Sequence, residues 1–308
     1  MTDLRIALGT IPFGTSVDDS TSFDLLDRFV AGGGTRIDTA NNYPFWVDGA
    51  SGDESELALG RWLVSRRTRD RVVLGTKCGG RPTNGRTLDS TEGLSAPAIR
   101  HAVEGSLRSL QTDSIDVYWA HVEDRSVPLE ETVGAFGELA AQGVVREVGA
   151  SNLPTWRLER GRQTARALGV QPWTHVQLRH TYLQPRPGVR LPEAGHTLVT
   201  PEMLDYVSVE PDLTLWAYNT LLFGAYTRPD RPLHEIFDHP GTTRRLAVLH
   251  DVAREADATV NQVVLGWLIA QGIVPIVGVT RVAQLDEALG GARLELGADL
   301  LARLDEPA

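Results

Sequence analysis

Short apolar runs alternate with amphipathic stretches along the whole 308-residue chain. The apolar runs predict eight β-strands, at residues 6–9, 35–39, 72–77, 115–121, 145–150, 174–178, 213–218 and 273–277. Near-continuous apolar strands are typical of a parallel sheet that is covered by helices. Between the strands, apolar residues recur at three- and four-residue spacing, for example at Ile99, Val103 and Leu107, which predicts amphipathic helices.

Eight strands alternating with helices, without a composition break or a linker, predict an α/β protein with one (β/α)8 TIM barrel over residues 1–308. A doubly wound open sheet is the alternative, although it normally has fewer strands for this length. The connections that leave predicted strands are long at 78–95, 179–198 and 219–241, whereas those that enter strands, such as 112–114, are short. Leaving connections form the C-terminal face of a barrel, so we expect the active site there.

Composition narrows the class of protein. The net charge of −10 argues against nucleic acid or an anionic membrane as a partner, and 42% hydrophobic against 23% charged residues excludes a disordered chain. The single cysteine, Cys78, allows no internal disulfide, lacks an obvious base and is expected in the core. We find no signal peptide and no apolar run long enough to span a bilayer, so we expect a cytoplasmic protein. The oligomeric state stays open.

Of the 30 basic residues only Lys77 is a lysine. Arginine replaces lysine at most surface positions, but not where a site requires a compact ammonium. Lys77 ends the third predicted strand, Asp38 ends the second, His121 ends the fourth, and Tyr43 follows Asp38 by five residues. The C-terminal mouth of a barrel would bring these four side chains together.

The four side chains suit proton transfer from a phenol. Free tyrosine, with a pKa of about 10, is a weak acid at neutral pH. We expect the ammonium of Lys77 to lower the pKa of Tyr43, and His121 to hydrogen-bond a carbonyl oxygen. Hydride from a nicotinamide cofactor would complete a carbonyl reduction. A lyase that forms a Schiff base at Lys77 is an alternative. His175 and His180 have no companions for a metal, so no metal site is expected.

The chain resembles the aldo-keto reductase superfamily over nearly its whole length. The resemblance is carried, in order and spacing, by GTRIDTA (34–40) with Tyr43, LGTK (74–77), TDSIDV (112–117) running to His121, GVVREVGASNL (143–153) and PIVGVTR (275–281). It implies a (β/α)8 barrel that reduces small-molecule aldehydes and ketones with NADPH, or alternatively NADH. It also implies that Asp38, Tyr43, Lys77 and His121 are the catalytic residues. A redox sensor of the same fold with little turnover, as proposed for potassium-channel β subunits, is a second interpretation.

The resemblance further implies a cofactor site. Its expected members are Gly9, Thr10, Ser151, Asn152, Gln177, Tyr218, Asn219, Leu221, Gly278, Thr280, Arg281, Gln284 and Glu287. Tyr218 is expected to stack on the nicotinamide, and Arg281, at the start of a helix, is the candidate for the 2′-phosphate. Phe45 and Trp46 either line the substrate pocket or pack on the barrel rim. Loops 44–53, 179–198 and 223–241 are expected to select the substrate, which the sequence leaves unidentified.

Overall fold

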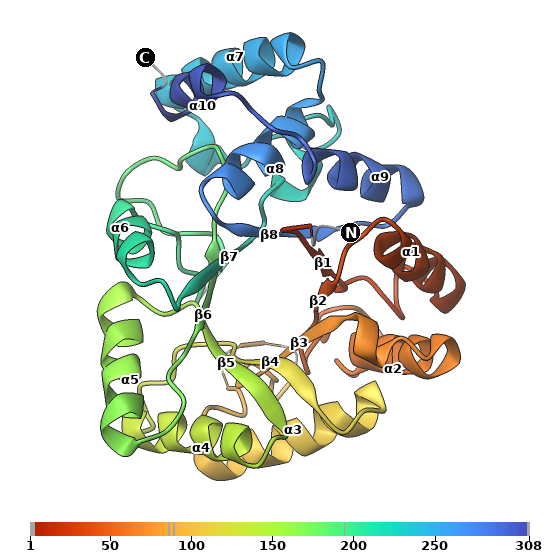
Figure 1. The fold of residues 1–308 in the computed structure, drawn as a ribbon, viewed down its shortest axis with the longest axis vertical. Coiled ribbons are helices and arrows are strands. Elements are labelled where there is room, and N and C mark those ends of the chain that lie inside the picture. The colour runs from red at the N-terminus through yellow and green to blue at the C-terminus, as the bar shows by residue number, and fades with distance from the viewer. Residues whose placement is uncertain (1–3, 86, 89, 194, 307–308) are drawn as a thin grey trace.

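The protein forms one closed barrel of parallel strands. The computed structural model describes residues 4–85, 87–88, 90–193 and 195–306. Each strand is hydrogen-bonded to the next in chain order, and β8 returns to β1 (Figure 1). The predicted (β/α)8 barrel is therefore confirmed, and the open sheet is excluded.

Each strand begins and ends within one residue of its predicted bounds. They are β1 Ala7–Gly9, β2 Arg36–Asp38, β3 Val73–Cys78, β4 Ile115–Ala120, β5 Val145–Ser151, β6 His175–Arg179, β7 Thr214–Tyr218 and β8 Val274–Gly278. The small differences arise because a strand ends where the ladder of hydrogen bonds ends, and not where the apolar run ends. His121 is the first residue after β4, and its N–H still donates to the carbonyl oxygen of Cys78 (2.8 Å), which keeps it next to the end of β3.

Helices cover the outside of the barrel (Figure 1). They are α1 Asp19–Ala31, α2 Glu54–Arg66, α3 Ala96–Leu110, α4 Leu129–Ala141, α5 Thr155–Leu168, α6 Pro201–Val209, α7 Pro240–Glu255, α8 Val260–Ala270, α9 Val282–Gly291 and α10 Ala298–Asp305. Short 3₁₀ helices lie at Arg69–Arg71, Leu222–Gly224 and Glu235–Phe237. Within the described ranges, no helix combines the length and the apolar character needed to cross a bilayer.

Local sequence explains where several helices begin and end. Ser95 caps α3 by accepting a hydrogen bond from the N–H of Ala98, and Thr259 and Gln262 form a capping box at the start of α8. Gly143 follows α4 with a φ of +74°, a conformation that glycine adopts without steric cost. It therefore ends the helix as its position in the sequence predicts.

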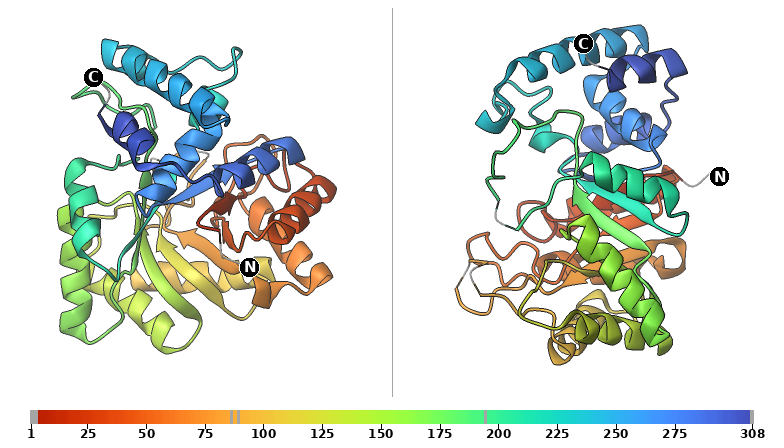
Figure 2. Two further views of the ribbon diagram at one scale, coloured as in Figure 1. Left: turned by 45° about the horizontal axis from the view of Figure 1, so that its top comes forward. Right: turned by 90° about the vertical axis from the view of Figure 1, so that its left-hand side faces the viewer.

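Tryptophan side chains fill the barrel. Trp119 from β4 and Trp216 from β7 meet edge to face (ring centroids 5.4 Å apart) in a cluster that also contains residues of β1 and β8. Gly149 makes room for them, because a Cβ there would lie 2.5 Å from the ring of Trp119. The interior is therefore solid, and ligands must bind at an end of the barrel. The long connections that follow β3 and β6 gather at one end (Figure 2).

Candidate active site

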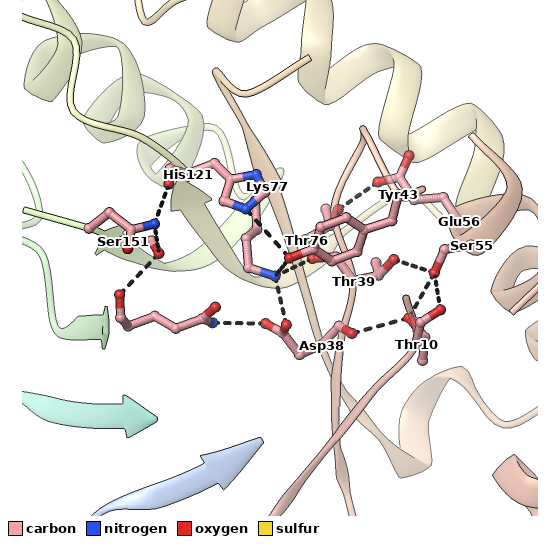
Figure 3. A network of polar contacts seen from close by, with 12 residues as sticks. Thr10, Asp38, Thr39, Tyr43, Ser55, Glu56, Thr76, Lys77, His121 and Ser151 are labelled. Atoms are coloured by element: carbon pink, nitrogen blue, oxygen red, sulfur yellow. Dashed lines mark hydrogen bonds and ion pairs between the residues drawn. The ribbon is translucent and has the colours of Figure 1, made fainter. Parts of the chain in front are cut away.

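The only lysine is completely buried at the C-terminal end of β3. Its side chain is 0% exposed, and Nζ lies 2.6 Å from Oδ2 of Asp38, 2.6 Å from the carbonyl oxygen of Thr39 and 3.4 Å from the hydroxyl of Tyr43 (Figure 3). An ammonium has three N–H donors, and these three acceptors match them. The carbonyl of Thr39 is a contact that side-chain patterns do not reveal.

Asp38, the last residue of β2, is held from two sides. Its Oδ2 pairs with Lys77, and its Oδ1 accepts a hydrogen bond from Nε2 of Gln177 (2.9 Å), which lies on β6 across the barrel. The family resemblance implies that Gln177 contacts the nicotinamide, whereas in the structure its Nε2 donates to Asp38. Ser151 donates in turn to the carbonyl oxygen of Gln177 (3.0 Å). The carboxylate is therefore held by side chains from two other strands, β3 and β6.

Tyr43 and His121 lie beside this pair. The hydroxyl of Tyr43 is 3.4 Å from Nε2 of His121, and the two rings meet edge to face. The carbonyl oxygen of His121 accepts a hydrogen bond from Nδ2 of Asn152 (3.1 Å). The structure thus brings together the four side chains expected at the barrel mouth, with the phenol hydroxyl between an ammonium and an imidazole.

The electrostatics of Tyr43 differ from the expectation. Burial, and secondly the negative charge of Asp38, raise the pKa of Tyr43 well above its ordinary value. The expectation that Lys77 gives this phenol a net lowered pKa is therefore wrong for the protein alone. Burial is the larger cause, and the charge of the ammonium is offset by Asp38, which lies 0.8 Å nearer to it (2.6 Å) than the phenol does (3.4 Å).

Burial has the opposite effect on the two basic groups beside Tyr43 and lowers their pKa. The pKa of Lys77 is lowered by burial, and the charge of Asp38 opposes this shift. The pKa of His121 falls well below 6.5, first through burial and then through the charges of Lys77 and His196. His121 is therefore neutral at neutral pH, and one ring nitrogen carries a proton that it can donate.

A second row of hydroxyl groups supports the end of β2. Thr10 donates to the carbonyl oxygen of Asp38 (3.1 Å), and Ser55 bonds the hydroxyls of both Thr10 and Thr39 (2.8 Å each; Figure 3). Thr10 was expected near the cofactor, but it is completely buried and its hydroxyl is engaged in these bonds. In this structure it supports Asp38 and is not accessible to a ligand.

Glu56 is a buried carboxyl that sequence analysis missed. It lies on α2 and accepts a hydrogen bond from the hydroxyl of Thr76 (2.6 Å), the residue before Lys77 (Figure 3). Burial raises the pKa of Glu56 to about 7, against the lowering effect of this bond. A charged residue on the inward face of an amphipathic helix was the available signal.

Asn152 and Tyr218, two residues expected to contact the nicotinamide, bond or pack against the connection between β6 and α6. Oδ1 of Asn152 accepts from the hydroxyl of Tyr218 (2.7 Å) and from the N–H of Thr197 (3.2 Å), while the ring of His196 meets Tyr218 edge to face. The side-chain amide of Asn219, just after β7, faces Arg179, and with its oxygen turned toward the guanidinium it would accept two hydrogen bonds. Arg179 is a buried cation at the end of β6 that sequence analysis also missed, since it is one of 29 arginines.

The remaining cofactor candidates lie at the ends of β1, β7 and β8. Gly9 pairs with Asp38 on one side and Gly278 on the other, and Leu221 follows β7. Thr280 and Gln284 bond each other at the start of α9, and Arg281 is exposed without a hydrogen bond or ion pair in the described part of the chain. Glu287 accepts from Thr259 and Asn261 at the start of α8. Its carboxylate is therefore directed to protein donors.

The other reactive side chains are used structurally. Cys78 is buried, and burial raises the pKa of its thiol, which disfavours a nucleophile. His175 bonds Glu147 and accepts from Trp216 (3.1 Å), while His180 packs against Trp267. The two imidazoles thus contact different groups and do not face one shared metal position.

Comparison with known proteins agrees with this geometry. The family model described as "Aldo/keto reductase family" matches residues 5–308. An uncharacterized oxidoreductase, YrpG of Bacillus subtilis, is 28% identical over 98% of this chain and 91% of its own. An aryl-alcohol dehydrogenase of Pestalotiopsis microspora is 27% identical over 90% of this chain and 70% of its own.

A fungal reductase matches part of the chain in sequence, and a solved structure matches nearly all of it in fold. Norsolorinic acid reductase A of Aspergillus parasiticus is 34% identical over 56% of this chain, and the match spans less than half (45%) of that reductase. The structure of a thermostable aldo-keto reductase, Tm1743, solved with the inhibitor epalrestat, superposes with a TM-score of 0.74 at 25% identity, covering 99% of this chain and 95% of the other. The barrel, the buried lysine and the match of the family model agree, and the chain belongs to the aldo/keto reductase family.

Proposed function

We propose that this protein reduces the carbonyl group of an aldehyde or ketone, with NADPH as the hydride donor and Tyr43 as the general acid. The observation that carries the proposal is the position of the Tyr43 hydroxyl, 3.4 Å from the ammonium of Lys77 and 3.4 Å from Nε2 of His121. Relatives named as reductases and dehydrogenases support the reaction class.

The raised pKa of Tyr43 suits this role. A general acid must hold its proton until the substrate oxygen becomes basic, and burial keeps the phenol protonated at neutral pH. A bound reduced nicotinamide supplies the hydride. As the carbonyl oxygen gains negative charge, the Tyr43 hydroxyl donates its proton, and the ammonium of Lys77 stabilises the phenolate that remains. Neutral His121 donates a hydrogen bond from Nε2 to the same oxygen and orients it.

The donor set beyond β8 fits the phosphates of a dinucleotide. Nothing lies within 4 Å of the position that a Cβ would take on Gly278, so the backbone there is open to a ligand. Arg281 provides an exposed cation, and it does not cap α9 with its side chain. A helix N-terminus with uncapped N–H groups and an adjacent arginine favours a phosphate. We assign Arg281 to the 2′-phosphate, which makes NADPH the expected cofactor.

The contacts of Lys77 argue against the Schiff-base alternative. A nucleophilic amine needs a free lone pair, whereas Nζ donates to Asp38, Thr39 and Tyr43. Steady-state turnover of NADPH distinguishes the proposed reductase from a redox sensor of the same fold. A protein that binds NADPH but oxidises none across a panel of aldehydes and ketones would contradict the proposed reductase.

The Tyr43→Phe variant tests the acid directly. We expect turnover to fall by roughly 10²- to 10⁴-fold, the usual contribution of a positioned acid, because no other hydroxyl replaces that of Tyr43. NADPH affinity, measured by quenching of tryptophan fluorescence, is expected to stay unchanged.

Tyr118→Phe is the matched control for this variant. Tyr118 is also buried, but it packs on Phe136 in the core that lies between barrel and helices. We expect it to retain wild-type turnover. Wild-type turnover in Tyr43→Phe itself would exclude Tyr43 as the acid.

A further inference from the structure

The segment that follows β2 presents one large aromatic side chain to solvent. Phe45 and Trp46 were expected either in the substrate pocket or packed on the rim, and the structure separates them. Phe45 is buried, while Trp46 is 48% exposed. The two rings meet edge to face with centroids 5.0 Å apart. Phe45 therefore supports the indole from behind and leaves the rest of it open.

Trp46 also contacts the proposed acid. Its ring meets that of Tyr43 at a centroid distance of 5.9 Å and an interplanar angle of 70°. A carbonyl oxygen that accepts a hydrogen bond from Tyr43 must place its carbon substituents next to this phenol. Because the indole neighbours this phenol, an aromatic substituent on the carbonyl carbon could pack against it, an arrangement in which aromatic groups attract each other.

The segment that carries Trp46 is held in place at both ends. Asn42 donates to the carbonyl oxygen of Gly80 (2.7 Å), and Arg81 forms an ion pair with Asp53 (2.7 Å). The N–H of Val47 closes a turn on the carbonyl oxygen of Pro44 (3.0 Å). A side chain on a fixed segment loses little conformational freedom on binding, so its contact contributes to affinity and selectivity.

The charge at this position favours an uncharged partner. The ammonium of Lys77 is paired with Asp38, and His121 is neutral, so neither of these two neighbours of Tyr43 is a free cation that would attract an anionic substituent. A flat apolar ring matches both the indole and this charge distribution.

We propose that Trp46 is the specificity-determining residue of the site and that it selects carbonyl compounds bearing an uncharged aromatic ring. This inference rests on the proposed carbonyl reduction, because it places the substrate oxygen at Tyr43. Trp46 acts by contact with the substrate ring and takes no part in the proton transfer.

The test compares Trp46→Ala with Trp156→Ala. Trp156 lies on α5 with the same exposure of 48%, and the guanidinium groups of Arg125 and Arg160 cover its ring, 5.8 and 5.1 Å from the centroid. For Trp46→Ala we expect kcat/KM to fall roughly tenfold or more for benzaldehyde and less than threefold for butanal, since aromatic contact plus buried ring area exceeds the energy of a tenfold change. Trp156→Ala is expected to change neither value, and Trp46→Phe to recover part of the loss.

Equal losses for benzaldehyde and butanal, or no loss for either, would overturn the inference while leaving the reductase intact. Binding of benzamide tests the aromatic site separately from the reductase activity, because hydride transfer from NADPH does not reduce its amide carbonyl. If the wild type reduces neither aldehyde but binds benzamide in the presence of NADPH, and Trp46→Ala weakens that binding tenfold, the aromatic site stands without the reductase. If Trp46→Ala binds benzamide as the wild type does, the aromatic site is refuted.

Discussion

Replacing Lys77 by methionine removes the buried positive charge, leaves the carboxylate of Asp38 in place, and keeps an unbranched side chain of similar length. Asp38 is 3% exposed and has two side-chain partners, Lys77 at 2.6 Å and Gln177 at 2.9 Å. Breaking a buried ion pair costs about 3–5 kcal/mol, because the remaining charge is left without its counter-ion. Since Gln177 still donates to Asp38, we expect the lower end, about 3 kcal/mol at pH 7.

The loss of stability in Lys77→Met should depend on pH in a defined direction. Protonation removes the unpaired charge of Asp38, so the folded variant binds a proton that the unfolded chain has released at the same pH. Stability then falls as pH rises, by about 1.4 kcal/mol per pH unit for one proton. In the wild type Lys77 remains as the counter-ion of Asp38, so no unpaired carboxylate is present at this position. The difference between the two proteins should therefore be smaller at pH 5 than at pH 7.

Chemical denaturation of wild type, Lys77→Met and the double variant Asp38→Asn/Lys77→Met at pH 5, 6, 7 and 8 measures this effect. The double variant carries no buried charge at these positions. We expect it to regain most of the lost stability and to lose the added pH dependence that Asp38 causes in Lys77→Met, keeping only that of the wild type. A Lys77→Met variant as stable as wild type at every pH would refute the buried ion pair. So would a double variant no more stable than Lys77→Met.

Two further predictions concern Glu56 and Arg281. The raised pKa of Glu56, about 7, means that the folded protein keeps a proton that the unfolded chain loses near pH 4.5, so wild-type stability from this group is lost as pH rises towards 7. In denaturation from pH 4.5 to 8, Glu56→Gln should gain about 3 kcal/mol relative to wild type, and a pH-independent difference would contradict this. Arg281→Gln should weaken NADPH binding roughly 10- to 100-fold, the effect of losing a charge-assisted hydrogen bond, and leave NADH binding unchanged. Fluorescence titration measures both affinities, and equal losses would exclude a contact with the 2′-phosphate.

The sequence by itself determined the barrel and the composition of its mouth. Apolar runs separated by amphipathic helices admit few arrangements, because each strand must bury both faces and each helix one. Once the barrel closes, residues at strand ends become neighbours, which is why Asp38, Lys77 and His121 could be grouped without coordinates. Lys77 could be recognised as a candidate site residue from the sequence, since every other basic residue in the chain is an arginine or a histidine.

Tertiary structure alone decided how those residues are charged and what they contact. The sign of the shift at Tyr43 depends on burial and on the distances to Lys77 and Asp38, and neither is encoded in periodicity. Gln177 reaches Asp38 from across the barrel, 139 positions away in the chain, so no local pattern carries that bond. Phe45 and Trp46 are adjacent and chemically alike, yet one is buried and the other exposed. Burial depends on contacts from distant segments, and a sequence pattern records only the neighbours along the chain.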